Sequence, residues 1–212
     1  MSWNDLQFFN PFAEIIHTAN MLPHWQQPGA TYFITFRLDD SIPATLRHHW
    51  QKEREQWLQH HPQPWSSETE AEYHTRFSAQ IDQWLDAGHG ACHLRDHETR
   101  RIVENTLNHF DSEQHFHHAW VIMPNHVHCL TTLAPAARLE KIIKSWKGFS
   151  ATNINKHLAR TGPFWQEDYF DRLIRDADHF ANCTRYIRRN PTKASLKPGS
   201  FTHFESDFAK QL

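Results

Sequence analysis

Hydrophobic and polar residues alternate in four parts of the chain, and this alternation predicts four β-strands. Residues 31–38 (TYFITFRL) alternate and are rich in β-forming side chains. Residues 116–123 and 126–133 predict two further strands, joined tightly at Pro124-Asn125, and residues 169–174 predict the fourth. The tight connection makes the second and third strands an antiparallel pair.

Apolar residues at helical spacing predict the other elements. A polar helix begins after Pro43 and ends near His60, and a second helix carries Phe77, Ile81, Trp84 and Leu85 before Gly88 and Gly90. Three more helices are expected over about residues 96–110, 136–160 and 176–190. We expect the last one to end at Asn190 because a proline, Pro191, follows.

The order of these elements is strand, helices, strand, strand, helix, strand, helix. It predicts an α+β fold of the ferredoxin-like (RRM-like) type, a split β-α-β arrangement with helices packed on a central antiparallel sheet. The helical hairpin at about 41–90 is surplus to that core and is expected to be an insertion. We therefore expect one domain over residues 29–195, preceded by an N-terminal extension (1–28) and followed by a C-terminal tail (196–212).

Composition narrows the class of protein. The 212-residue chain has no run of eighteen apolar residues, which excludes a membrane-spanning helix. Its first residues lack the basic and apolar regions of a secretory signal. The three cysteines, Cys92, Cys129 and Cys183, are far apart and form no CxxC pair, which favours reduced thiols and a cytoplasmic location.

Charge is distributed unevenly along the chain. The formal net charge is −2, but residues 136–198 contain 13 Lys and Arg against 6 Asp and Glu, a net charge of +7. A local basic region on a nearly neutral protein indicates a face that binds a polyanion, although a solvated helix face has the same composition.

The helix over 136–160 contains four lysines that could follow a DNA backbone: Lys141, Lys144, Lys147 and Lys156. Trp146 and Phe149 lie between them in the sequence. An exposed aromatic residue there could stack on an unpaired base, but the spacing of these two favours the core.

His126 and His128 lie two positions apart on a predicted strand, so they share one of its faces while Val127 points to the other. The pair alone is weak evidence for a metal site, because 19 histidines produce about two such pairs by chance and His115 and His117 form another. Apolar neighbours on both sides indicate a central strand, where two buried imidazoles need partners. Two converging nitrogens make half of a metal site; the alternative is a pair of hydrogen-bonded core histidines.

The last helix has an apolar stripe made by Phe180, Cys183 and Ile187. Tyr186 lies beside this stripe, and Asn190 shares its face one turn later. Three arginines surround the tyrosine: Arg185, Arg188 and Arg189. They are expected to contact phosphates and to lower the cost of forming a phenolate.

Taken together, these motifs resemble a known family. The segment Pro124-Asn125-His126-Val127-His128-Cys129 combines with Trp165-Gln166, Tyr169, Asp171, Ile174-Arg175 and Tyr186-Ile187…Asn190-Pro191. This set is similar to the single-tyrosine HUH transposases of insertion sequences, and most similar to their REP-associated tyrosine transposase branch. The resemblance covers about residues 29–195, interrupted by the insertion.

The resemblance implies a divalent cation, Mg²⁺ or Mn²⁺, bound by His126, His128 and Asn190, with Tyr186 as nucleophile. Insertion-sequence relatives commonly have Gln where this chain has Asn190, and the REP-associated branch tolerates Asn. It also implies nicking and strand transfer of single-stranded or hairpin (REP-like) DNA, through a 5′-phosphotyrosine and a free 3′-OH, as monomer or homodimer. The bond energy is conserved, which agrees with the absence of a nucleotide-binding P-loop motif.

Three alternatives remain at this stage. Tyr169 is a competing nucleophile, although nearby acidic residues would raise the pKa of its phenol. A non-catalytic RRM-like module would bind structured nucleic acid without cutting it. A zinc phosphoesterase would need a third strong ligand, and the sequence has no obvious candidate.

Overall fold

The computed structural model describes residues 6–19, 23–62 and 65–212. Its strands are β1 (Ile16–Ala19), β2 (Pro23–Gln26), β3 (Thr31–Arg37), β4 (His115–Ile122), β5 (His126–Leu133), β6 (Phe170–Leu173) and β7 (Thr202–Glu205). Its helical elements are α1 (Ala44–His60), α2 (Ser67–Tyr73), the π-helix η2 (His74–Ser78), α3 (Ala79–Asp86), η3 (His93–Arg95), α4 (His97–Asn108), α5 (Leu139–His157), α6 (Ala177–Lys193) and η4 (Ala209–Gln211). No helix among the described residues is long and apolar enough to cross a membrane.

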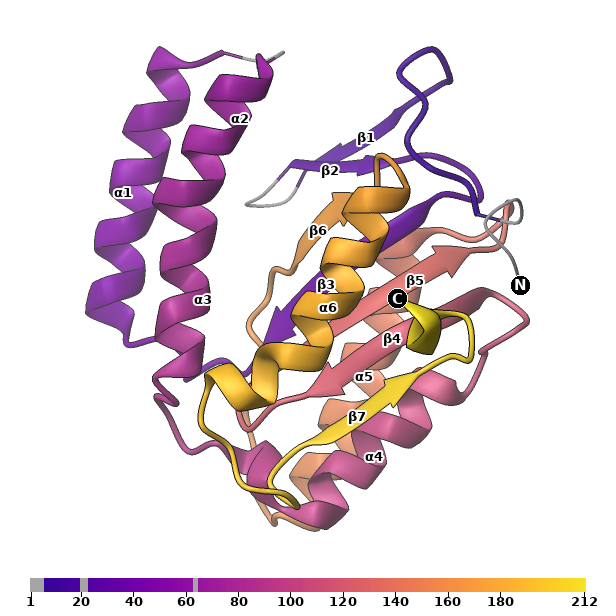
Figure 1. Ribbon diagram of the computed structural model, residues 1–212. Helices are drawn as coiled ribbons and strands as arrows, with labels where there is room; N and C mark the ends of the chain where they lie inside the picture. Colours follow the sequence, from indigo (N-terminus) through magenta and orange to yellow (C-terminus); the bar gives the residue numbers. More distant parts are fainter. Residues whose placement is uncertain (1–5, 20–22, 63–64) are drawn as a thin grey trace.

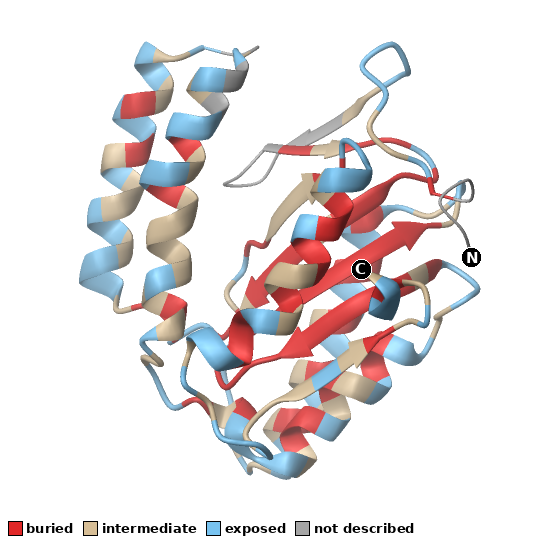
Figure 2. Ribbon diagram, viewed as in Figure 1, coloured by how far each residue is buried: buried red, intermediate tan, exposed pale blue. Residues whose placement is uncertain are grey.

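A five-stranded antiparallel sheet forms the centre of the molecule, in the order β6-β3-β5-β4-β7 (Figure 1). Every residue of β5 is buried, because this strand has neighbours on both edges and helices on both faces. The predicted α+β class and central antiparallel sheet are confirmed. Figure 2 shows the burial concentrated in this sheet and in the helix faces that cover it.

The sheet separates two apolar clusters. On one face, α4 and α5 pack against residues such as Phe36, Trp120 and Val127. On the other face, α6 packs Phe180 and Ile187 against Val121 and Leu130. Because side chains of a strand point alternately to its two faces, neighbouring residues of β5 contribute to opposite clusters.

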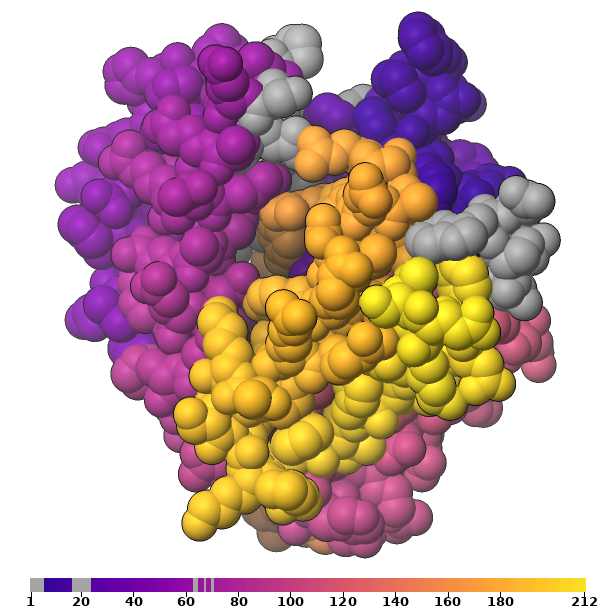
Figure 3. Space-filling view, in the orientation of Figure 1, coloured from indigo at the N-terminus to yellow at the C-terminus, as the bar shows by residue number. Residues whose placement is uncertain are grey.

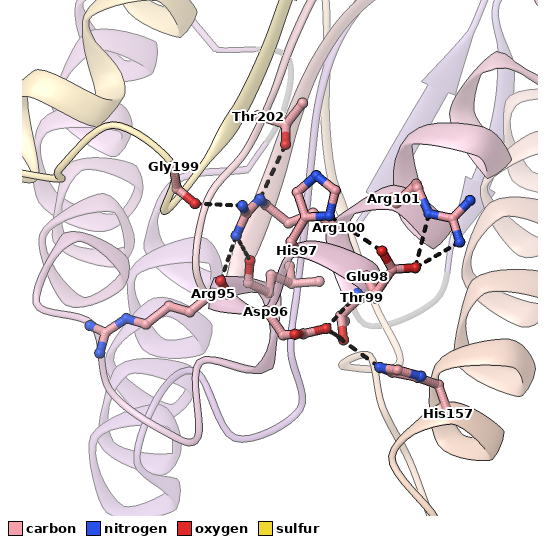
Figure 4. Close-up of polar contacts among 11 residues, drawn as sticks. Arg95, Asp96, His97, Glu98, Thr99, Arg100, Arg101, His157, Gly199 and Thr202 are labelled. Carbon is pink, nitrogen blue, oxygen red and sulfur yellow. Dashed lines mark hydrogen bonds and ion pairs between the residues drawn. The ribbon is translucent and has the colours of Figure 1, made fainter.

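Polar contacts hold the start of α4 to the C-terminal segment (Figure 4). The Asp96 carboxylate caps α4 by accepting from the Thr99 amide at 2.8 Å. The buried Arg100 guanidinium donates to the Thr202 hydroxyl at 3.1 Å and to the Gly199 carbonyl at 2.5 Å. These bonds anchor the loop that leads into β7.

Two helical stretches form a hairpin between β3 and α4, where the sequence predicts an insertion. The hairpin consists of α1 and the continuous run α2-η2-α3, and its aromatic residues make a small core of their own around Trp57, Tyr73 and Phe77. Much of its outer surface is exposed (Figure 2). It stands beside the β6 edge of the sheet (Figure 1).

The prediction that the last helix ends at Asn190 is wrong, because α6 continues to Lys193 with Pro191 inside it. Proline removes one amide donor, but its fixed φ is compatible with a helix. The next turn still closes, since the Ala194 amide donates to the Asn190 carbonyl at 3.0 Å. Asn190 therefore lies in a regular helical turn.

The two terminal segments contribute to the sheet region. Residues 196–212, expected to be a tail, contain β7, which pairs with β4 from Ala119 to Ile122. Within the expected N-terminal extension, β1 and β2 form a hairpin, and the Phe9 amide donates to the Ile174 carbonyl at 2.8 Å. Four-residue strands carry too little alternation to be recognised in a sequence.

Candidate active site

His126 and His128 lie on the α6 face of β5, and each is 1% exposed. Their rings are 4.6 Å apart between centroids and nearly perpendicular, at 74°. On the neighbouring strand β3, Thr35 pairs with His128 and Arg37 pairs with His126. The prediction that the two imidazoles share one face, with Val127 in the opposite core, is confirmed.

Hydrogen bonds orient both imidazoles. The Asn125 amide nitrogen donates to the carbonyls of Leu85 (3.2 Å) and His89 (3.4 Å), which turns its oxygen towards His126. That oxygen lies 2.8 Å from His126 Nδ1, so Nδ1 must be the protonated nitrogen and Nε2 keeps a free lone pair. His128 Nδ1 is 2.7 Å from the Thr35 hydroxyl.

Several buried polar atoms around these rings have no hydrogen-bond partner among the described residues. They are Nε2 of His126, Nε2 of His128, the Tyr186 hydroxyl, and both amide atoms of Asn190. Buried polar groups are nearly always paired in folded proteins. A group of unpaired atoms from β5 and α6 is what an absent ligand would explain.

Both imidazoles are neutral at physiological pH, the form that binds metals. Burial lowers the pKa of His126 to about 3, against a smaller upward effect of the Asn190 amide. Burial lowers the pKa of His128 well below its usual range, and the nearby His126 adds to this. In the part of the chain that the structure describes, no three His, Cys, Asp or Glu side chains are grouped to hold a metal. The polar side chain that α6 places next to His126 is the amide of Asn190.

Tyr186 lies on α6 against the histidine pair. Its ring meets His128 edge-on at 5.2 Å and Phe33 at 5.7 Å. Both the tyrosine and His128 belong to the same chain, so one protomer brings the two together. Tyr169, the competing tyrosine, instead stacks on His24 at 4.3 Å in the other apolar cluster.

The neighbouring arginines do not lower the pKa of Tyr186, contrary to the expectation from the sequence. Burial raises this pKa, and the charges of Asp82 and Asp86 raise it further. Arg188 forms a two-pronged ion pair with Glu205 on β7, at 2.8 and 2.9 Å. Among the other two arginines, Arg185 donates to Asn182 at 2.8 Å and Arg189 is exposed.

Asp82, on α3 of the helical insertion, is a site residue that the sequence reasoning missed. It lines the same cleft as Tyr186, and burial raises the pKa of its carboxyl to about 6. One turn later, Asp86 forms an ion pair with Lys193 of α6 at 2.8 Å. This ion pair connects α3 to α6 and helps to hold the insertion against the tyrosine helix.

Helix α5, which carries Lys141, Lys144 and Lys147, covers the opposite face of the sheet from α6 (Figure 1). Lys141 and Lys144 are exposed there, whereas Lys147 donates to the Glu167 carbonyl at 2.5 Å. Burial lowers the pKa of Lys147 to about 8. As expected, Trp146 is in the core; Phe149 is 61% exposed, contrary to the expectation from spacing.

A cleft of about 580 Å³ opens beside Tyr186, between the helical insertion and the β6 edge of the sheet. In the space-filling view it is the hollow between the purple helices and the orange α6 (Figure 3). The histidine pair lies behind Tyr186 and is not part of the cleft wall. Tyr186 and Tyr169 both line this cleft, so a ligand there would contact the tyrosines before the histidine pair.

Comparison with known proteins gives a matching family model and several similar solved structures. Residues 93–190 match the model of the family described as transposase IS200 like, a segment that contains His126, His128, Tyr186 and Asn190. A REP-associated tyrosine transposase bound to a REP hairpin is similar at 15% identity and a TM-score of 0.45, over 82% of this chain and 73% of that one. A putative transposase from Deinococcus radiodurans is similar at 12% identity and a TM-score of 0.40, over 87% and 98%. No curated protein matches the chain.

Proposed function

Because residues 93–190 match the model of the IS200-like transposase family, we propose that this protein nicks and rejoins single-stranded DNA through a covalent bond to Tyr186. The substrate would be hairpin DNA of the REP type, in transposition or in a function derived from it. The observation that carries the proposal is the grouping of unpaired buried atoms from His126, His128 and Asn190 beside the Tyr186 ring.

We also propose that the core of this fold is a ferredoxin-like unit. The elements β3-α4-β4-β5-α5-β6 follow the order of the ferredoxin-like split β-α-β unit, with strand order β6-β3-β5-β4. In this reading the hairpin α1 to α3 is an insertion after the first strand, and β7 extends the sheet. The unit brings the centre of β5 under α6.

His126, His128 and Asn190 are the residues that would hold Mg²⁺ or Mn²⁺. Such an ion neutralises charge that develops on the phosphoryl oxygens of the scissile bond. All three donors are neutral, so the full charge of the ion would remain available to a phosphate. The hydrogen bond that His126 donates to the Asn125 oxygen and the one between His128 and the Thr35 hydroxyl keep the two imidazoles turned towards this position.

Tyr186 would attack the phosphorus, forming a 5′-phosphotyrosine as the bond to the 3′ oxygen breaks. The phenol must lose its proton during this step, and burial makes that loss costly. We assign the role of proton acceptor to Asp82, whose carboxylate faces the same cleft. The departing 3′ oxygen takes up a proton and becomes a free hydroxyl, so the reverse reaction can rejoin the strands.

Arg185 and Arg189 remain candidates for phosphate contacts on the tyrosine helix, together with Lys141, Lys144 and Lys147 on α5. Arg188 is less available because Glu205 already binds it. A binding module without catalysis is a weaker alternative, because it would not account for the unpaired atoms around His126 and His128.

The test is incubation of the protein with a labelled hairpin oligonucleotide carrying a single-stranded extension, with Mn²⁺. The proposal predicts cleavage that stops in a chelator and in Tyr186→Phe, whereas Tyr169→Phe cleaves normally. Cleavage by Tyr186→Phe at the normal rate would contradict it. Metal-independent binding without any cleavage would favour the binding module.

A further inference from the structure

The helical insertion forms one wall of the cleft next to Tyr186. From the insertion, α1 contributes Arg47, Trp50 and Arg54, and the run η2-α3 contributes Ile81 and Asp82. The opposite wall comes from β3, the segment 166–175 and α6. A chain that enters this hollow (Figure 3) would touch the insertion and the tyrosine helix together.

Three arginines in the wall have no carboxylate partner among the described residues. Arg47 donates to the Gln166 amide oxygen at 2.5 Å, and Arg54 donates to the Tyr73 hydroxyl at 2.6 Å. Arg37, on β3, donates to the Ser41 hydroxyl at 3.2 Å. These hydrogen-bond partners are neutral, and the carboxylates of Asp39 and Asp168 compensate the charge of Arg37 only in part.

Two of these charges are held close together. Burial and the positive charge of Arg47 lower the pKa of Arg37 to about 10, against a smaller upward effect of Asp39 and Asp168. Like charges in a partly buried place are unfavourable for the free protein. An anion bound between Arg37 and Arg47 would relieve this repulsion and gain charge-assisted hydrogen bonds.

The wall also contains three carboxylates, and two of them contact side chains other than these arginines. Asp168 accepts from His24 at 3.2 Å, and Asp82 faces Tyr186. Glu55 is the third. The arginines of α1 and β3 therefore provide an excess of positive charge that the rest of the cleft does not neutralise.

An aromatic ring stands among these arginines. The Trp50 indole nitrogen donates to the Phe77 carbonyl at 3.2 Å, which fixes the ring in the wall of the cleft. Arg54 lies over this ring at 5.7 Å. Fixed aromatic rings interleaved with arginines are the usual means by which proteins hold unpaired nucleotides, because bases stack on the rings and phosphates bind the guanidinium groups.

We propose that the helical insertion is a DNA-binding arm, which holds unpaired nucleotides of the substrate strand in the cleft beside Tyr186. Arg47, with Arg37 opposite, contacts phosphates, and Trp50 stacks on a base. This inference rests on the proposed function and adds a binding surface to it. The insertion lies outside the segment 93–190 that matches the transposase family.

The experiment measures binding of a single-stranded oligonucleotide by fluorescence anisotropy, in chelator and over a series of salt concentrations. All proteins carry Tyr186→Phe, so that no covalent product forms. Arg47→Gln is expected to weaken binding about tenfold and to lower the salt dependence by about one phosphate contact. Trp50→Ala should weaken binding about tenfold, and Trp50→Phe should retain most of it.

Lys52→Gln is the matched control, because Lys52 is an exposed cation on the same helix outside the cleft. It should bind as the parent protein does. Circular dichroism of each variant shows whether the hairpin remains folded, since Arg47 and Trp50 are both half-buried whereas Lys52 is exposed.

Unchanged affinity and unchanged salt dependence in Arg47→Gln would overturn the inference. So would an equal loss of binding to fully paired DNA, since unpaired bases would then not be what the arm holds. Cleavage by the protein with native Tyr186, together with unchanged binding by Arg47→Gln, would leave the proposed function standing and reject the arm alone. Absence of any single-strand binding or cleavage would reject both.

Discussion

Asp82 on α3 and Tyr186 on α6 face each other in the wall of one cleft, close enough for each to shift the pKa of the other. The carboxylate raises the pKa of the phenol, while the phenol opposes the increase that burial causes in the pKa of the carboxyl. The hydroxyl nevertheless has no well-aligned hydrogen-bond partner among the described residues. This pair connects the insertion to the proposed chemistry.

Replacing Asp82 by Asn should make the protein more stable and less active. The pKa of Asp82 rises from 3.8 to about 6 on folding, so the carboxyl destabilises the folded state once pH rises through this range. The free energy of unfolding of Asp82→Asn, measured with urea, should therefore exceed that of the native protein by about 2 kcal/mol at pH 8 and by almost nothing at pH 4. Its cleavage rate should fall at least tenfold because the proton acceptor is gone. Equal stability at pH 8, or unchanged cleavage, would contradict this.

The metal can be tested without catalysis. A ligand that binds only the folded state at 100 times its dissociation constant adds about 2.7 kcal/mol to the free energy of unfolding. Mn²⁺ should therefore raise the melting temperature of the native protein and of Tyr186→Phe. His128→Gln removes one proposed donor and should abolish this increase. An increase that survives in His128→Gln would place the ion elsewhere.

Sequence patterns predicted the histidine pair and Tyr186 because each depends on local geometry. The two-residue spacing places His126 and His128 on one face of β5, and the helical stripe places Tyr186 against that face. Sequence patterns could not predict that Asp82 is part of this site, because its approach to Tyr186 depends on how a separate hairpin packs beside the sheet. The spacing of residues also could not show which face of the sheet α5 covers. Because α5 and α6 lie on opposite faces, Lys141 and Lys144 are separated from Tyr186.

Arg188 and Arg189 are neighbours on α6 that should behave differently. Arg188 holds the buried carboxylate of Glu205 on β7, whereas Arg189 is exposed. Arg188→Gln should lower the free energy of unfolding by about 1 to 2 kcal/mol, because the buried carboxylate of Glu205 then keeps only its contact with His203 among the described residues. Arg189→Gln should leave stability unchanged and weaken binding of single-stranded DNA about threefold or more. Urea unfolding and anisotropy titrations on both variants check this. A loss of DNA binding in Arg188→Gln and a loss of stability in Arg189→Gln would contradict the assignment of Arg188 to the ion pair.

His24 should make stability depend on alkaline pH. Burial alone would lower its pKa, but hydrogen bonds with Asp168 and Asp171 outweigh this and raise it to about 9. The stabilisation is fully present below pH 6.5 and is lost as pH rises through about 9. The free energy of unfolding of the native protein should exceed that of His24→Gln by about 2 kcal/mol at pH 6.5 and by much less at pH 10. A difference that does not change between these pH values would show that His24 is not charged in the folded state.

The central claim is that Tyr186 becomes covalently bound to DNA, and mass spectrometry of the trapped conjugate tests it most directly. The protein is incubated with a hairpin oligonucleotide and Mn²⁺, digested with nuclease and trypsin, and searched for peptides that carry a nucleotide. Trypsin separates the two candidate tyrosines, because Tyr186 falls in residues 186–188 and Tyr169 in residues 161–172. We predict that the nucleotide is attached through its 5′ phosphate to the peptide of Tyr186. Attachment to the peptide of Tyr169, or cleavage with no conjugate at all, would contradict the account.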